Sequence, residues 1–288
     1  MENFFIDCNS LADVKRLLRD SLSPKYGQRE ASEMTRLILM HLKNWDLTRL
    51  VANEDNEAGD YIKAKCAEIL QQLLEDVPIQ YALGETLFYG LKLKVGPGVL
   101  IPRPETQQLV DIIVDENKKS DLKVLDLCTG SGAIAIALAR NLPFSTVEAL
   151  DFSSSALEYA AENAHILKTK IHLIRGDIFK TNFSPHEFDI IVSNPPYVCE
   201  SEKKDMEPNV LNFEPTEALY VPDDDPLLFY RRIAQIGIET LKPGGRLYLE
   251  INPLHAAQLK RLLETTGYKE VTVLKDIHGK DRFAKAKV

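Results

Sequence analysis

The chain has 288 residues, enough for one large domain or for a medium domain and a small one. Its hydrophobic content of 44% and charged content of 27% are typical of a soluble globular protein. The net charge of -8 argues against a protein that coats nucleic acid non-specifically, because such binding depends on neutralising phosphates.

The cysteines and the apolar runs indicate the compartment. None of the four cysteines has C-x-x-C spacing, so we expect no metal site, no disulfide framework and a reducing environment. The N-terminus is acidic and lacks the basic start of a signal peptide, and no apolar run is long enough to span a membrane. We therefore expect a cytoplasmic protein that makes no membrane contact.

Three stripes of apolar residues at helical spacing occupy the first 77 residues. They begin at Leu11, Met34 and Ile62. Apolar residues three or four positions apart form one buried face of a helix. We therefore expect residues 1–77 to form a small helical bundle.

Residues 78–106 have a different composition, with glycines and prolines between short apolar segments. The pieces at residues 87–89 and 91–95 flank Gly90, which favours a β-hairpin. This segment is too apolar for a flexible linker, so we expect a connector that carries a hairpin.

Strands and helices alternate in the rest of the chain, residues 107–288. Alternation of this kind predicts a parallel, doubly wound α/β sheet. The expected strands are residues 124–127, 146–150, 171–174, 188–192, 246–251, 271–274 and 282–288, and the expected helices are residues 133–140, 154–165, 226–241 and 254–265.

A glycine-containing turn, Asp126-Leu127-Cys128-Thr129-Gly130-Ser131-Gly132, follows the first of these strands. Its glycines permit a tight turn and close approach of a ligand to the backbone. The turn leads into a helix N-terminus, where free N–H groups attract negative charge. It is neither a dinucleotide fingerprint, because position 135 is alanine, nor a P-loop, because no Gly-Lys-Ser/Thr follows.

Aspartates stand at the ends of three successive strands, at positions 126, 151 and 177. Asp151 occupies the place where an acidic residue hydrogen-bonds ribose hydroxyls. Asp177 is placed to accept from the amine of an adenine, with Ile178 against the ring. Together they predict an adenosine pocket without a phosphate clamp, which suits S-adenosylmethionine because that molecule carries an amino acid instead of phosphates.

The tetrapeptide Asn194-Pro195-Pro196-Tyr197 follows the strand at residues 188–192, at the sheet edge where ligands bind. Proline has no N–H group, so the carbonyls of this stiff turn can only accept. With the side-chain oxygen of Asn194, two acceptors can hold both hydrogens of one planar NH2 group. Tyr197 offers a flat face for stacking. The alternative is a turn that merely ends the strand, with a core tyrosine.

Here the residues carry a family resemblance. Residues 121–197 resemble the class I, seven-stranded S-adenosylmethionine-dependent methyltransferases. Within that class, Asn-Pro-Pro-Tyr resembles the motif of the branch that methylates planar nitrogens. Residues 78–84, 88–90, 98–106 and 213–219 resemble the glutamine methyltransferases of peptide chain release factors, the HemK/PrmC family. The N-terminal part resembles that family only in being helical, without a specific shared motif.

The resemblance implies a Rossmann-like seven-stranded sheet and methyl transfer from S-adenosylmethionine to the N5 amide nitrogen of the glutamine in the factor's Gly-Gly-Gln motif. We expect Asn194, Pro195 and Tyr197 to be catalytic, with two acceptors orienting the amide and the tyrosine stacked on it. The residues expected to bind the cofactor are Asp126, Cys128, Thr129, Gly130, Ser131, Gly132, Asp151, Asp177, Ile178 and Asn194. Those expected to bind the substrate are Asn194, Pro195, Pro196, Tyr197 and Glu105.

Two other functions remain open at this point. The same tetrapeptide would serve an enzyme that methylates adenine N6 or guanine N2 on a flipped base. The negative net charge and the lack of a basic recognition domain favour a protein substrate over nucleic acid. We therefore expect no stable binding of nucleic acid. A scaffold without catalysis is the third possibility. The helical part is expected to dock the release factor, or alternatively to serve as a stabilising lid.

The chain departs from the family pattern at four positions. Cys128 stands where glycine is frequent, Ser131 where threonine is common, and Ile178 where an aromatic residue is often found. Gln107 replaces a frequent glutamate. We expect the isoleucine to weaken stacking on the adenine and the other changes to leave the site intact.

Overall fold

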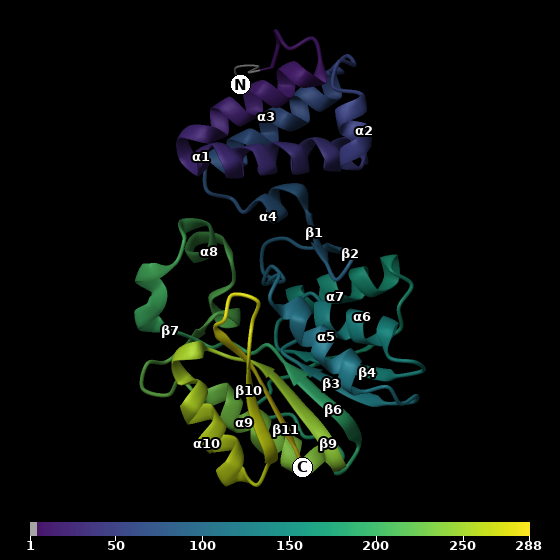
Figure 1. The fold of residues 1–288 in the computed structure, drawn as a ribbon, viewed down its shortest axis with the longest axis vertical. Coiled ribbons are helices and arrows are strands. Elements are labelled where there is room, and N and C mark those ends of the chain that lie inside the picture. Colours follow the sequence, from purple (N-terminus) through teal and green to yellow (C-terminus); the bar gives the residue numbers. More distant parts are fainter. Residues whose placement is uncertain (1–4) are drawn as a thin grey trace. The chain divides into compact units, whose positions relative to one another are not determined.

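The computed structural model describes residues 5–288, apart from the side chain of Asp205. The chain forms two compact units (Figure 1). The helical unit comprises residues up to Gly84 together with Pro208–Phe213, and the sheet unit comprises Glu85–Glu207 and Glu214–Val288.

The helical unit confirms the expected bundle. Its longest helix breaks at Gly27, where φ is 77°, so the two expected stripes that begin at Leu11 and Met34 lie on either side of the break. Ser10 caps the start of this helix through a capping box with Asp13. Its helices are α1 (Leu11–Lys43), α2 (Leu47–Ala52), α3 (Asp60–Leu74), α4 (Ile79–Leu83) and α8 (Pro208–Phe213).

The expected hairpin is present in the sheet unit. Strands β1 (Glu85–Phe88) and β2 (Leu91–Lys94) pair antiparallel. Tyr89 and Gly90 between them have φ values of 51° and 71°. Positive φ at both loop positions matches the right-handed twist of the paired strands.

The main sheet has seven strands in the order β10-β11-β9-β6-β3-β4-β5 (Figure 1). This confirms the Rossmann-like sheet, with one correction to the parallel arrangement: β11 runs antiparallel to both of its neighbours. The connection from β10 to β11 is too short for a helical crossover, so a hairpin forms instead. The strands are β3 (Lys123–Leu127), β4 (Thr146–Asp151), β5 (His172–Arg175), β6 (Phe188–Ser193), β9 (Leu241–Glu250), β10 (Lys269–Lys275) and β11 (Asp281–Lys287).

Helices cover both faces of this sheet because both faces are apolar. Val124 packs in the core on the side of α5 and α6, whereas its neighbour Leu125 packs on the side of α9 and α10. The sequence predicts no element where α5 lies. The helices are α5 (Thr106–Glu116), α6 (Ala133–Asn141), α7 (Ser154–Ile166), α9 (Leu228–Thr240) and α10 (Ala256–Thr266).

Short elements follow the fourth parallel strand, β6. Strands β7 (Val198–Cys199) and β8 (Tyr220–Val221) form a two-residue parallel pair. Three short 3-10 helices are η1 (Glu200–Asp205), η2 (Thr216–Ala218) and η3 (Pro253–His255). The β7–β8 pair brings the chain after Asn-Pro-Pro-Tyr back toward the sheet edge.

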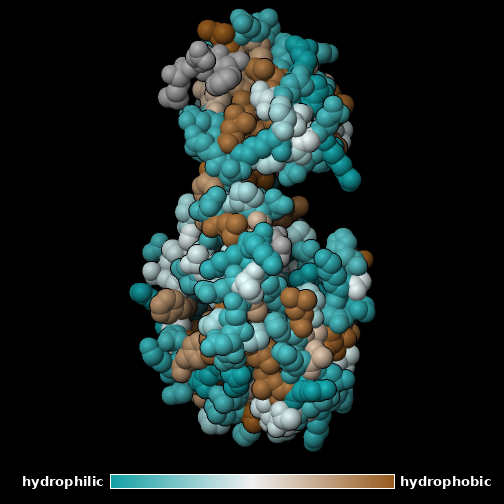
Figure 2. All heavy atoms as spheres, turned by 90° about the vertical axis from the view of Figure 1, so that its left-hand side faces the viewer, coloured by the Kyte–Doolittle hydropathy of each residue, from teal (hydrophilic) through white to brown (hydrophobic). Residues whose placement is uncertain are grey.

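One face of the molecule is mostly polar (Figure 2). On the face drawn in Figure 2, hydrophilic residues cover most of each unit and hydrophobic residues form small groups between them. Within residues 5–288, no helix combines the length and the apolarity needed to cross a bilayer.

Candidate active site

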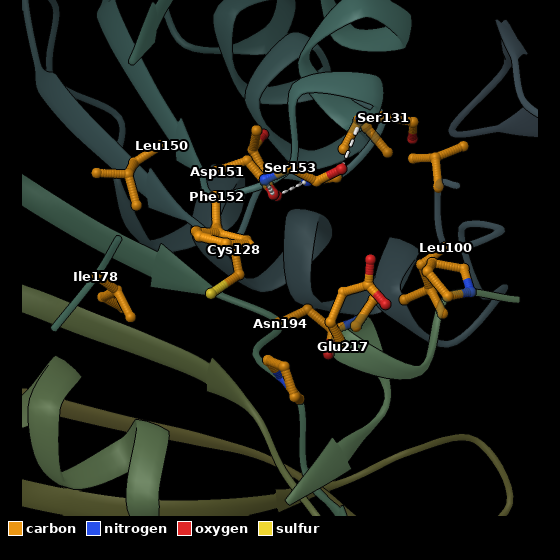
Figure 3. A pocket seen from close by; sticks show the side chains of 18 of the residues that line it. Leu100, Cys128, Ser131, Leu150, Asp151, Phe152, Ser153, Ile178, Asn194 and Glu217 are labelled. Atoms are coloured by element: carbon orange, nitrogen blue, oxygen red, sulfur yellow. Dashed lines mark hydrogen bonds between the residues drawn. The ribbon is translucent and has the colours of Figure 1, made fainter. Parts of the chain in front are cut away.

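A pocket opens at the carboxyl edge of the main sheet, where β3, β4, β5 and β6 end. Figure 3 shows Leu150 and Ile178 toward one end of it and Asn194, Glu217 and Leu100 toward the other. Segments before α5 and after α8 complete its walls. The lining residues are Gly98, Val99, Leu100, Pro102, Thr106, Cys128, Thr129, Gly130, Ser131, Ala133, Ile134, Leu150, Asp151, Phe152, Ser153, Ala156, Gly176, Asp177, Ile178, Phe179, Asn194, Pro196, Pro215, Glu217, Ala218 and Phe229.

The turn after β3 needs glycine at two positions. Gly130 has a φ of 56° and Gly132 a φ of 78°, a region that side chains rarely adopt. A Cβ atom on Gly132 would lie 3.1 Å from the Cβ atom of Ala160, so α6 and α7 approach closely there. Residues 128–131 of this turn line the pocket.

Asp151 at the end of β4 holds the turn in place. Its Oδ2 atom accepts from the Gly130 amide at 2.8 Å, and its Oδ1 atom accepts from the Ser153 amide at 2.9 Å (Figure 3). Burial raises the pKa of this carboxyl group. Each oxygen retains a further lone pair, which allows Asp151 to accept from a ligand hydroxyl.

Asp177, after β5, is held by its own loop. Its carboxylate accepts from the Phe179 amide at 2.9 Å and pairs with Lys180 at 3.2 Å. The Phe179 amide and the lysine hold the pKa of Asp177 below its usual value. Asp177 therefore presents a charged acceptor at the pocket.

Aromatic rings that the sequence analysis missed line the pocket. Phe179 follows Ile178 directly and packs edge-on against Phe229, with ring centroids 5.2 Å apart. Phe152 follows Asp151 and is 67% exposed. Phenylalanines next to two predicted site residues were the signal in the sequence. They supply the flat apolar surface that Ile178 lacks.

Asn194 lies at the junction of two cavities. It lines the main pocket, and it also lines a smaller adjoining cavity with Pro195 and Tyr197. Strand β6 delivers it there, and the Ser193 hydroxyl donates to the Leu127 carbonyl at 2.6 Å, which joins β6 to β3. The remaining residues of the smaller cavity are Leu100, Arg103, Val198, Ala218 and Leu219.

Three of the predicted site residues line neither cavity. Asp126 is fully buried behind the turn, where it accepts from the Thr129 hydroxyl at 2.6 Å. Burial raises its pKa to about 7. Gly132 lies at the N-cap of α6, and Glu105 at the N-cap of α5. The structure thus places most of the predicted residues together and sets these three around them.

Comparisons with known proteins give a matching family model for each of the two units. Residues 13–84 match the family model of the PrmC N-terminal domain, and residues 104–212 match that of the methyltransferase small domain. A release factor glutamine methyltransferase of Bacteroides thetaiotaomicron is 44% identical over 274 residues, which cover 95% of this chain and 98% of the relative. The chain belongs to the release factor glutamine methyltransferase family. A relative of the same name from Flavobacterium psychrophilum is 43% identical and covers 92% and 94% of the two chains.

Membership of the release factor glutamine methyltransferase family makes the chain an S-adenosylmethionine-dependent methyltransferase. A crystal structure of a methyltransferase from Pyrococcus furiosus shares the fold, with a TM-score of 0.51, 20% identity and coverage of 75% of this chain and 95% of that one. The pocket fits the methyl donor, because its lining combines carboxylates for hydroxyl and amine groups with apolar rings and includes no lysine or arginine to hold phosphates.

The backbone at Cys128 has a conformation that glycine adopts most freely. Its φ of 62° lies in the left-handed region, which costs a residue with a side chain about 1 kcal/mol. Burial raises the pKa of its thiol well above the ordinary value, so the thiol stays protonated and unreactive. Cys128 is a small packed residue of the turn.

Proposed function

We propose that this enzyme methylates the side-chain amide nitrogen of the glutamine in the Gly-Gly-Gln motif of peptide chain release factors. The position of Asn194 at the junction of the two cavities carries this proposal. The main pocket has the lining for S-adenosylmethionine, and the smaller cavity has carbonyl oxygens and a tyrosine for a planar amide. The names of the relatives agree with this substrate.

The tetrapeptide would position the amide for attack. An amide nitrogen is a poor nucleophile because its lone pair is delocalised into the carbonyl group. Acceptance of both N–H bonds, by Asn194 Oδ1 and the Pro195 carbonyl, draws the nitrogen out of the amide plane and directs its lone pair at the main pocket. Tyr197 holds the amide plane from one side. Catalysis is then positioning together with preorganised acceptors.

The reaction balances without a covalent enzyme intermediate. S-adenosylmethionine supplies an electrophilic methyl group on its sulfonium. The amide nitrogen forms a bond to that carbon as the carbon–sulfur bond breaks, and the bonding pair stays on sulfur. The methylated nitrogen then releases one proton to solvent.

The substrate is tested by following the label from methyl-labelled S-adenosylmethionine. The enzyme is incubated with a release factor, with the same factor in which the motif glutamine is changed to alanine, and with DNA or RNA. We expect label only on the glutamine of the unaltered factor. Label on nucleic acid would establish base methylation instead, and no label on any acceptor would support a scaffold.

The role of Asn194 is tested by Asn194→Ala. We expect kcat to fall about 100- to 1000-fold, the usual effect of removing one preorganised acceptor or donor. Affinity for S-adenosylmethionine, measured by calorimetry, should change little. Asn141→Ala is the matched control, because among residues 5–288 the Asn141 side chain bonds only the Ala137 carbonyl on α6. Wild-type kcat in Asn194→Ala would rule out this mechanism.

We infer further that the helical unit docks the release factor. It presents exposed apolar side chains, among them Val51 (58% exposed) and Tyr61 (66% exposed). Tyrosines at interfaces often carry more than about 1 kcal/mol of binding energy. Tyr61→Glu should therefore raise KM for the factor about tenfold and leave affinity for S-adenosylmethionine unchanged. Ile277→Glu, at an exposed site of the sheet unit, is the control, and equal KM values would favour a lid.

A further inference from the structure

The buried carboxylate of Glu250 contacts Tyr197 at one end of the tetrapeptide directly and reaches Asn194 at the other end through Thr106. Glu250 is the last residue of β9 and is 1% exposed. Its Oε2 atom accepts from the Thr106 hydroxyl at 2.6 Å, and its Oε1 atom accepts from the Tyr197 hydroxyl at 3.1 Å. The Nδ2 atom of Asn194 lies 3.5 Å from the Thr106 oxygen.

We propose that Thr106 and Glu250 are positioning residues that fix which end of the Asn194 amide faces the methyl acceptor. This inference rests on the proposed function of Asn194 as an acceptor. It adds two residues that the sequence motif does not contain, one from the start of α5 and one from the end of β9.

The direction of the hydrogen bonds carries the inference. A threonine hydroxyl has a single hydrogen, and the charged carboxylate of Glu250 can only accept, so that hydrogen is committed to Glu250. The Thr106 oxygen can therefore only accept from its other neighbour. Asn194 must present its NH2 group to Thr106, which leaves Oδ1 directed away from Thr106 toward the substrate.

The opposite orientation of the Asn194 amide would disable the site. It would place a donor where the substrate amide also offers donors, and two oxygens would face each other at Thr106. The side chain alone does not distinguish the two orientations, because its oxygen and its NH2 group are nearly equal in size. The surrounding hydrogen bonds therefore select the orientation.

Glu250 must be charged for this arrangement to hold. Burial raises the pKa of Glu250, and the nearby charge of Glu105 acts in the same direction, whereas the hydroxyls of Thr106 and Tyr197 and the positive charge of Arg282 favour the charged carboxylate. A protonated Glu250 could donate to Thr106 and release the threonine hydrogen toward Asn194. The same carboxylate also holds the ring of Tyr197, so both ends of the tetrapeptide depend on it.

Thr106→Val tests the inference, because valine keeps the shape of threonine and removes the hydroxyl. We expect kcat to fall about ten- to a hundredfold, the scale of a misplaced reacting group, with affinity for S-adenosylmethionine within about twofold of wild type. Thr106→Ser keeps a hydroxyl and should recover most of kcat. Thr240→Val is the matched control, because Thr240 is equally buried and, within the described part of the chain, its hydroxyl bonds only the Ile236 carbonyl on α9.

A double-mutant cycle distinguishes an effect of Thr106 that acts through Asn194 from a general loss of structure around the site. If Thr106 acts through Asn194, Thr106→Val should cost little further kcat in the Asn194→Ala background. Equal losses in both backgrounds would overturn the inference, as would wild-type kcat in Thr106→Val. Unfolding curves of all variants check that the fold is kept.

A measurement on the free enzyme keeps this test independent of the substrate. The side-chain NH2 group of Asn194 gives two proton signals by NMR, assigned by their loss in Asn194→Asp. In wild type we expect one proton to be protected from exchange by Thr106, and in Thr106→Val we expect that protection to vanish. Unchanged signals would overturn the inference, whereas failure of the proposed function would show in the separate labelling experiment, as the absence of label on the release factor.

Discussion

Arg103 donates a hydrogen bond to the buried carboxylate of Glu214 over 2.8 Å, although 111 positions separate the two residues. The other oxygen of Glu214 accepts from the Ile101 amide at 3.1 Å. Glu214 thereby ties the segment before α5 to the segment after α8. Both segments line the main pocket, through Pro102 on one side and Glu217 on the other.

Arg103→Ala should remove the hydrogen bond to Glu214, make the two segments less firmly connected and weaken binding of S-adenosylmethionine. The Glu214 side chain is 1% exposed and would keep only one partner, which costs about 1–3 kcal/mol. We expect a lower denaturation midpoint and an affinity for S-adenosylmethionine reduced about tenfold by calorimetry. Arg231→Ala is the control, since its ion pair with Asp225 is largely exposed and contributes about 0–1 kcal/mol. Equal effects of the two changes would contradict the prediction.

Asp151→Asn should weaken binding of S-adenosylmethionine by about tenfold or more. The carboxylate accepts from two backbone amides, those of Gly130 and Ser153, and an asparagine has one oxygen for two donors. The turn that carries Gly130 then loses its anchor. Calorimetric titration of the variant measures the effect, with Asp189→Asn at the far end of β6 as a control. Wild-type affinity would show that the turn holds its shape without this anchor.

Cys128→Val should destabilise the sheet unit by about 2 kcal/mol or more. Valine is β-branched and tolerates a φ of 62° worse than cysteine does. Cys128→Gly should fold and bind S-adenosylmethionine, because glycine adopts this conformation freely. Denaturant unfolding of both variants measures the difference. Cys66→Val, in the ordinary helical backbone of α3, is the control and should cost much less.

Asp126 should make stability depend on pH between about pH 4 and 7. Burial raises its pKa to about 7 from the ordinary 3.8, so in this window the folded protein holds a proton that the unfolded chain has released. The free energy of unfolding therefore falls as pH rises, by up to about 1.4 kcal/mol per pH unit.

The comparison of wild type with Asp126→Asn at pH 5, 6 and 7 tests this dependence. The variant cannot titrate at this position, so its free energy of unfolding should fall less steeply across the window. Asp225→Asn serves as the control, because the ion pair with Arg231 lowers the pKa of Asp225 below this range. Identical slopes for wild type and Asp126→Asn would show that Asp126 is ionised when buried.

Much of the fold could be predicted from local patterns. Helical periodicity predicted the bundle, and strand–helix alternation predicted the sheet from β3 onward, because the apolar pattern of each helix or strand is visible within about ten residues. Helix α5 was missed because it follows a connector rich in proline. The strand β11 was predicted, but its antiparallel direction was missed, because alternation alone does not reveal whether a short connection returns as a hairpin.

By itself, the sequence determined the chemistry that the sheet edge presents: a glycine turn, strand-end aspartates and Asn194-Pro195-Pro196-Tyr197. These signals are readable because each lies in one short stretch. Only the tertiary structure decided that Asp126 lies behind the turn, that Phe229 completes the pocket, and that Glu250 and Thr106 stand behind Asn194. Glu250 and Thr106 are 144 positions apart, and no local pattern encodes a hydrogen bond that forms only when distant elements pack together.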